Sequence, residues 1–73
     1  MGPMTTFYSI NVRRKTGEWQ NELSMRKGIP PKQGDVIEAH IHGEVVKARV
    51  TNTAANPSKA RDEPAMNVYA EQI

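Results

Sequence analysis

Residues 34–50, GDVIEAHIHGEVVKARV, carry the clearest structural pattern in the sequence, because apolar and polar side chains alternate on both sides of His42-Gly43. From Ile37 to Ile41 every second residue is apolar, and the residues between them are polar. This period of two is typical of a half-buried strand. Glycine adopts a positive φ freely, and histidine tolerates one better than a branched residue does. The pattern therefore predicts a hairpin with a two-residue loop.

A loop at residues 42–43 determines the pairing of the two strands. Ala39 then faces Val46 on the apolar side, and Glu38 faces Lys47 on the other side. The same register pairs Ile37 with Ala48 and His40 with Val45. Apolar residues meet apolar residues and an acid meets a base, so both faces of the hairpin predict one register.

Residues 6–25, TFYSINVRRKTGEWQNELSM, predict an earlier hairpin. Its apolar residues are Tyr8, Ile10 and Val12 before the turn, and Trp19, Leu23 and Met25 after it. A four-residue loop at 14–17 would set Val12 against Trp19 and Tyr8 against Leu23. Under this register Asn21 falls on the apolar side, which conflicts with the pattern.

Residues 17–27 also match a short helix. Thr16 suits the N-cap, Arg26 and Lys27 suit the last turn, and Gly28 follows as a C-terminal glycine. However, the apolar positions form only a thin stripe, and about 11 residues are marginal for a helix without packing. The strand interpretation is preferred, with the helix as its alternative.

The remaining segments are shorter or lack a period. Residues 28–34, GIPPKQG, predict an extended connector because two prolines restrict the backbone. Residues 52–65, NTAANPSKARDEPA, predict a long mobile loop because they contain turn formers and charges without periodicity. Residues 66–73, MNVYAEQI, predict a last strand, and residues 1–5 a disordered start or a cloning scar.

Five short strands in one chain of this length predict a small antiparallel barrel. Residues 34–50 resemble the central hairpin of SH3-like small barrels, in which a Gly-Asp pair opens a strand and an x-Gly turn returns it. The resemblance covers 17 of the 73 residues. It implies an all-β, five-stranded SH3-like barrel over residues 6–73, and it implies no particular activity. Such barrels often bind peptides, RNA or DNA.

Size and composition narrow the classes of function. A single domain of 73 residues has a small core and little room for a deep catalytic pocket. The chain has no cysteine, which is compatible with a reducing cytoplasm and excludes disulfides and thiolate metal sites. No apolar run approaches the roughly 18 residues of a membrane span. We therefore expect a cytoplasmic protein that does not contact a membrane and has no cofactor.

The most specific chemical interpretation of the 34–50 hairpin is a metal site. His40 and His42 project to the same face of a strand, and Glu38 or Glu44 could supply a third ligand. The stretch matches the opening G-x5-H-x-H of the cupin metal motif, but the later glutamate and glycine of that motif are missing. We prefer to interpret both histidines as exposed residues beside a turn, and no metal site is expected.

The charge is unevenly distributed along the chain. Residues 1–33 carry six Lys/Arg and two Asp/Glu, a net +4, whereas residues 34–73 carry a net −2. Basic residues can follow a phosphate backbone, and Phe7 has the outward parity that base stacking needs. The candidate nucleic-acid-binding residues are Phe7, Arg13, Arg14, Lys15, Lys47 and Arg49.

No catalytic set is recognisable in the sequence: it has no nucleophile in a known setting and no phosphate-binding glycine loop. We therefore expect a protein that is not an enzyme. The first hypothesis is a small adaptor or interaction domain with an unidentified protein partner. The alternative is a domain that binds single-stranded nucleic acid, RNA or DNA, through the basic first half of the chain.

Overall fold

A computed structural model of the chain describes residues 6–55 and 66–73. These residues form one six-stranded sheet, and none of them is helical. The strands are β1 (Thr6–Arg13), β2 (Trp19–Asn21), β3 (Arg26–Gly28), β4 (Val36–Ile41), β5 (Glu44–Ala55) and β6 (Met66–Gln72). The all-β prediction is confirmed, and the alternative helix at 17–27 is wrong. Within these two ranges there is no helix of the length and hydrophobicity that crossing a membrane requires.

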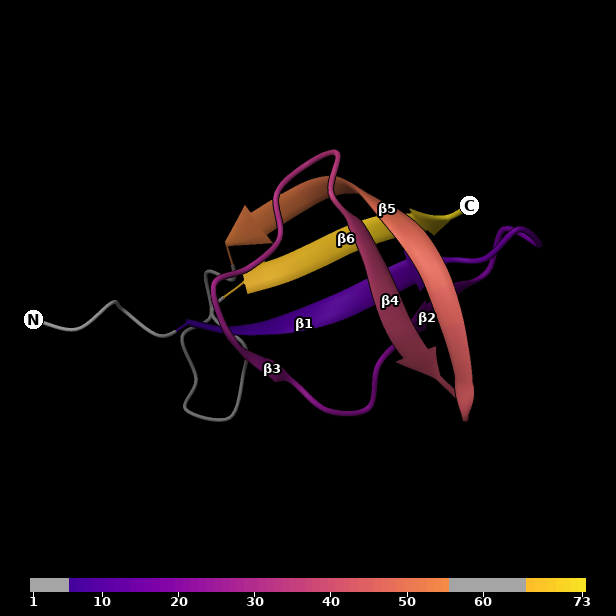
Figure 1. Cartoon of the computed structure of the whole chain (residues 1–73), viewed down its shortest axis with the longest axis horizontal. Helices are drawn as coiled ribbons and strands as arrows, with labels where there is room; N and C mark the ends of the chain where they lie inside the picture. Colours follow the sequence, from indigo (N-terminus) through magenta and orange to yellow (C-terminus); the bar gives the residue numbers. More distant parts are fainter. Residues whose placement is uncertain (1–5, 56–65) are drawn as a thin grey trace, which may run out of the picture.

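The sheet has the strand order β2-β1-β6-β5-β4, and β3 pairs with β1 beyond the end of β2. It curls into a half-barrel, so that β4 and β5 pass in front of β1 and β6 (Figure 1). Two details differ from a five-stranded antiparallel barrel: there are six strands, and β1 runs parallel to β6. Residues 14–65 separate β1 from β6, so no tight turn forces them to be antiparallel.

The hydrophobic core lies on the inner face of the curled sheet. All of its buried residues come from β1, β4, β5 and β6: Tyr8, Ile10, Val12, Ala39, Ile41, Val46, Ala48, Val50, Val68 and Ala70. Ile37 and Met66 pack against this core and are partly buried. The short strands β2 and β3 contribute no buried apolar side chain, so they cover an edge of β1 rather than fill the barrel.

The β4–β5 hairpin has the predicted register. Ala39 faces Val46 and Glu38 faces Lys47, as the two-residue loop requires. The backbone φ is 50° at His42 and 78° at Gly43, and two positive values in succession are the signature of a type I′ turn. This turn matches the twist of the flanking strands, which explains why the sequence pattern predicts the register correctly.

The β1–β2 hairpin differs from its prediction by one residue. The Arg14 N–H donates to the Glu18 carbonyl at 2.7 Å, so the loop has three residues, 15–17, and ends at Gly17 with a φ of 94°. Val12 consequently faces Gln20 instead of Trp19. A shift of one residue moves every side chain of β2 to the opposite face. Trp19 is therefore 54% exposed, and the conflict at Asn21 disappears because Asn21 also points outward.

A bulge at residues 22–25 separates β2 from β3. The Glu22 N–H bonds the Ile10 carbonyl, and the next paired residue, Arg26, faces Tyr8. The predicted pairing of Tyr8 with Leu23 is therefore wrong. Leu23 is 97% exposed, because the bulge carries its side chain away from the sheet.

Strand β5 continues through residues 52–55, which the sequence pattern assigned to a mobile loop. After an irregularity between Val50 and Asn52, Thr53 faces Val68 and Ala55 faces Met66. The backbone partners offered by β6 outweigh the weak strand propensity of this stretch. The rest of the predicted loop, residues 56–65, and the predicted disordered start, residues 1–5, lie outside the described residues.

Candidate nucleic-acid interface

Three aromatic rings lie on the outer face of the sheet, opposite to the core. Trp19 is 54% exposed, Phe7 is 47% exposed and Tyr69 is half-buried. The Trp19 and Tyr69 rings meet edge to face, with centroids 5.8 Å apart and planes at 90°. This contact orients the indole while half of its surface stays accessible. We call this surface the aromatic–basic face, and it consists of Phe7, Trp19, Tyr69, Arg13, Lys27 and Arg49.

The register places Arg13 next to Trp19, and Arg49 further along the same row of the sheet. Trp19 faces Arg13 across the β1–β2 hairpin, Arg13 aligns with Glu71 on β6, and Glu71 faces Arg49 on β5. The Arg13 Nη1 and Glu71 Oε1 atoms are 3.8 Å apart, and both side chains are about half exposed. An exposed ion pair of this kind is weak, so Arg13 can exchange Glu71 for another anion at little cost.

The Phe7 ring also has a cation beside it. Phe7 faces Lys27 across β1 and β3, and the Lys27 Nζ lies 5.8 Å from the centroid of the phenyl ring. This distance allows a cation–π interaction, which holds the ammonium over the outer surface. Phe7 therefore has the outward position that its parity predicts.

Hydrogen-bonding side chains occupy the outer face between these two ends. The Ser9 hydroxyl donates to Asn67 Oδ1 at 2.6 Å, and Asn11 Nδ2 donates to the Val68 carbonyl at 3.2 Å. These bonds link β1 to β6 and hold both amides in fixed orientations. The centre of the face therefore offers neutral donors and acceptors in positions set by the sheet.

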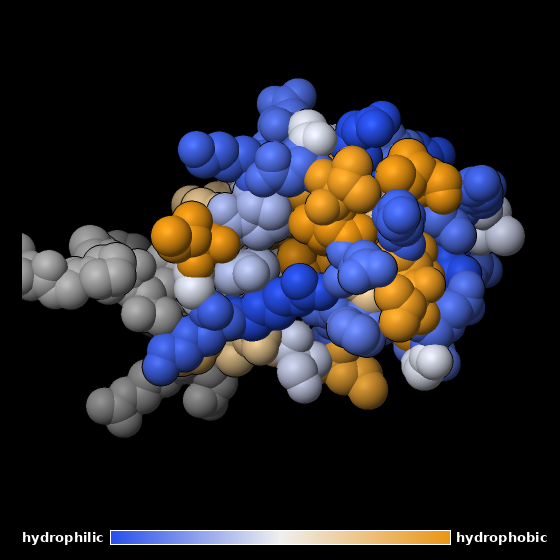
Figure 2. Space-filling model, viewed as in Figure 1, coloured by the Kyte–Doolittle hydropathy of each residue, from blue (hydrophilic) through white to orange (hydrophobic). Residues whose placement is uncertain are grey.

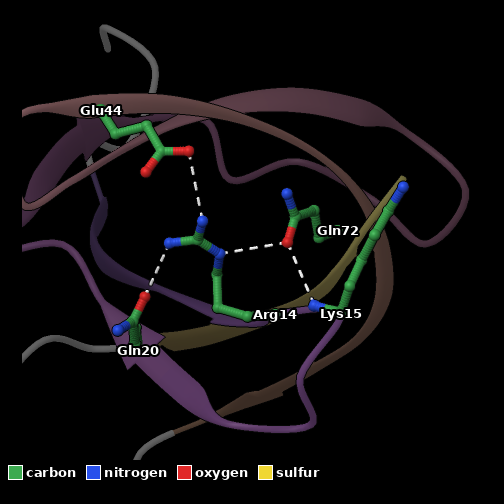
Figure 3. Close-up of polar contacts among 5 residues, drawn as sticks. All are labelled: Arg14, Lys15, Gln20, Glu44 and Gln72. Atoms are coloured by element: carbon green, nitrogen blue, oxygen red, sulfur yellow. Dashed lines mark hydrogen bonds and ion pairs between the residues drawn. The ribbon is translucent and has the colours of Figure 1, made fainter.

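Arg14 has a different environment from the other predicted basic residues. Its guanidinium donates to Gln72 at 3.1 Å, to Gln20 at 2.8 Å and to Glu44 at 3.2 Å (Figure 3). Its side chain is only 20% exposed. The Arg14 side chain thus ties the ends of β1, β2, β5 and β6 together, and each of its three nitrogens already donates within the protein.

The other predicted basic residues are divided between the loop and β5. Lys15 is exposed in the β1–β2 loop, where its backbone N–H donates to Gln72 Oε1 at 3.1 Å. Lys47 and Arg49 both point outward from β5, facing Glu38 and Val36 on β4. Of these residues, only Arg49 reaches the row that contains Trp19.

The structure therefore places Phe7, Arg13 and Arg49 on one outer face of the sheet and adds Trp19, Lys27 and Tyr69 to that face. Trp19 was missed because the four-residue loop placed it in the core. Tyr69 was missed because the pairing of β6 with β1 joins distant segments. Lys27 is one of the basic residues of the first half of the chain, and only the pairing of β3 with β1 places it beside Phe7. The glycine of the Lys15-Thr16-Gly17 loop is the signal that could have shown the correct parity of Trp19, since three-residue hairpin loops commonly end with a left-handed glycine.

A second group of polar residues lies where the half-barrel remains open, between β4 and the β2–β3 segment. We call this place the seam. The Glu22 carboxylate accepts from the His40 N–H at 2.7 Å, and Arg26 Nη2 donates to the Glu38 carbonyl at 2.6 Å. Glu22 and Arg26 also form a two-bonded ion pair at 2.8 and 2.7 Å. Side chains thus replace the backbone ladder that would otherwise close the barrel.

The ion pair of the seam uses the two backbone groups that flank Ala39 on the free edge of β4. These groups are the Glu38 C=O and the His40 N–H. In a parallel sheet, a residue of the neighbouring strand that lies opposite Ala39 would bond the same two groups. The Glu22 side chain is only 7% exposed. We conclude that Glu22 and Arg26 cover the edge of β4 as a short strand would, which protects it from pairing with another chain.

The seam shifts the pKa values of both side chains. Burial of the Glu22 carboxylate opposes its ionisation, but the hydrogen bonds from Arg26 and the His40 N–H outweigh this effect and hold the pKa of Glu22 below its ordinary value. The hydrogen bond to Glu22 raises the pKa of Arg26, against the opposing effect of burial. Both groups are therefore charged at neutral pH.

An open pocket adjoins the seam and is lined by Leu23, Met25, His40 and His42, among others. On the face shown in Figure 2, where β4 and β5 lie in front, several apolar groups lie at the surface, separated by hydrophilic side chains. The two histidines are exposed. Across residues 6–55 and 66–73, no group of three or more His, Asp or Glu residues is placed to hold a metal ion.

Compared with known proteins, the chain matches no protein-family model, no curated protein and no solved structure at a significant level.

Proposed function

We propose that the protein is a non-enzymatic binding domain and that its ligand is single-stranded nucleic acid. The observation that supports this proposal is the pair of half-exposed rings, Phe7 and Trp19, each beside a cation on one sheet face. Aromatic rings stack on bases of any sequence, and lysine and arginine neutralise phosphates. A single strand is favoured because a duplex keeps the faces of its bases stacked inside the helix.

The finer assignment of the fold as an SH3-like barrel belongs to the same proposal. Its support is the 34–50 hairpin together with the curled all-β sheet. A cytoplasmic location is also proposed, and its support is the lack of cysteine in the sequence.

Trp19 is the only tryptophan, so its fluorescence reports directly on the proposed interface. Titration with an oligothymidylate at two salt concentrations should quench this fluorescence, and the affinity should fall steeply as salt rises, because binding releases counterions. Trp19→Ala should weaken the binding of a labelled oligonucleotide by about 5- to 100-fold. Leu23→Ala, an exposed apolar residue away from the aromatic–basic face, is the matched control and should bind normally. An absence of binding at low salt would refute the proposal.

Variants of the neighbouring residues Arg13 and Arg14 distinguish a phosphate contact from a structural role. Arg13→Gln should lower the slope of log affinity against log salt by about 0.7, the value for one phosphate contact on a single strand. Arg14→Gln should instead lower stability and leave this slope unchanged, because its guanidinium bonds Gln20, Glu44 and Gln72. Equal slopes for Arg13→Gln and the wild type would remove Arg13 from the interface.

The second candidate function is an adaptor that binds another protein, and the exposed apolar residues beside the seam favour it. Leu23 is 97% exposed and Met25 is 44% exposed, and both line the open pocket. A pull-down with and without nuclease distinguishes the candidates. A partner that survives nuclease and is lost with Leu23→Ser and Met25→Ser supports the adaptor, whereas a nuclease-sensitive capture lost with Trp19→Ala supports nucleic-acid binding.

A further inference from the structure

The aromatic–basic face has one stacking ring at each end of β1, with a cation beside it. Phe7 and Lys27 lie at one end, and Trp19 and Arg13 lie at the other. Phe7 and Arg13 point to the same side of one strand and are six residues apart, which corresponds to about 20 Å. The sheet therefore holds two stacking positions at a fixed separation.

The outer face between the two ends is uncharged. The outward residues of β1 and β6 there are Ser9, Asn11, Asn67 and Tyr69. Ser9 and Asn11 hydrogen-bond to Asn67 and to the Val68 carbonyl, so the amides are already oriented. This middle section can donate and accept hydrogen bonds to bases and sugars, while the charges that attract phosphates lie at its two ends.

We infer that the bound strand lies along β1, with one base stacked on Phe7 and another on Trp19; this inference rests on the proposed function. A stacked single strand advances about 3.4 Å per nucleotide, so about six nucleotides span the 20 Å, and a more extended strand needs fewer. The ligand is therefore an unpaired stretch of about four to six nucleotides, near the lower end of the site sizes of small nucleic-acid-binding barrels.

Two stacking positions on one rigid strand make the affinity depend on the length of the ligand in a specific way. A dinucleotide reaches only one of the two rings. A strand that reaches both gains the second contact within an already formed complex, and one base–aromatic stack is worth about 5- to 100-fold in affinity. Beyond that length, further nucleotides meet no further ring of this face.

The test measures fluorescence anisotropy of labelled oligothymidylates from the dinucleotide to the decanucleotide, at one low salt concentration. For the wild type we expect the affinity to rise by about 5- to 100-fold up to the hexanucleotide and then to change little. Phe7→Ala should still bind the dinucleotide, at the Trp19 position, but lack the rise. Phe7→Tyr, which keeps a stacking ring and the strand propensity, should restore it.

Failure of the proposed function and failure of the path along β1 give different results. If no oligothymidylate binds at any length, the proposed function fails and the inference fails with it. If binding is present but rises without a plateau, or if Phe7→Ala weakens every length equally, nucleic-acid binding stands and the path along β1 is wrong. Phe7→Tyr keeps the test decisive if Phe7→Ala does not fold, because a length dependence absent from that variant would equally contradict the path.

Discussion

The two hairpins of this protein use alternating sequences for different purposes. The β4–β5 hairpin has six consecutive pairs, and both of its strands bury apolar side chains. The β1–β2 hairpin has three pairs, and only β1 contributes to the core. Its second strand instead directs Trp19 outward and leads into the Glu22–Arg26 ion pair. The β4–β5 hairpin thus contributes core residues from both strands, whereas β2 contributes the exposed Trp19 and leads into the seam.

The difference follows from which face of each strand can be buried. On β5, Val46, Ala48 and Val50 find partners across the half-barrel. On β2, Gln20 is the inward residue, and its amide accepts from Arg14 at 2.8 Å. A polar residue in the inward position ends the apolar core there, so the first hairpin is held mainly by hydrogen bonds.

The largest expected effect compares one apolar residue from each region. Ile41→Ala should lower the free energy of unfolding by about 2–5 kcal/mol, because it removes a fully buried side chain. Leu23→Ala should change it by less than about 0.5 kcal/mol, because that side chain is 97% exposed. Urea denaturation followed by circular dichroism measures both. If Ile41→Ala does not fold, Ile41→Val replaces it and should lower the free energy of unfolding by about 0.5–1.5 kcal/mol. A loss for Leu23→Ala as large as that for the Ile41 variant would contradict the bulge at residues 22–25.

The next effect tests the seam. Glu22→Ala leaves the Arg26 guanidinium and the His40 N–H without their partner, and it should lower the free energy of unfolding by about 1.5–3 kcal/mol. Glu18→Ala is the matched control, because Glu18 is exposed and close in sequence, and it should cost less than about 0.5 kcal/mol. Equal losses for the two variants would show that the seam does not hold the barrel closed.

A smaller effect should appear on acidification. Because the pKa of Glu22 is lower in the folded protein, ionised Glu22 adds stability above its unfolded pKa of about 4.3, and this contribution is lost as the pH falls through the folded value. The difference in unfolding free energy between the wild type and Glu22→Gln should therefore be largest near neutral pH and shrink in acid. A difference that stays constant from neutral pH to acid would contradict the role assigned to the carboxylate.

The smallest effect concerns the loop of the β4–β5 hairpin. His42 has a φ of 50°, and asparagine adopts this conformation more readily before a turn glycine. His42→Asn should raise the free energy of unfolding by about 0.5 kcal/mol. Thermal unfolding of the two proteins at one pH provides the measurement, and a clear destabilisation would mean that the His42 imidazole makes a contact that the type I′ turn does not explain.

The β4–β5 hairpin is predictable from its own residues, because its loop and both of its faces specify one register. His42-Gly43 forms a tight turn with two positive φ values, and a slip of one residue would expose Ile37, Ala39 and Ile41. The outward position of Phe7 is likewise predictable, through the parity of β1. These features depend on neighbouring residues, so a local pattern is sufficient to predict them.

The position of Trp19 and the composition of the aromatic–basic face depend instead on how distant segments pair in the folded protein. The sequence pattern on one side of the first turn is compatible with two loop lengths, and the choice between them reverses the face of every residue in β2. Tyr69 and Lys27 join Trp19 and Phe7 because β6 and β3 pair with β1. Such pairings depend on burial of the core and on free strand edges across the chain, which no local period of two can specify.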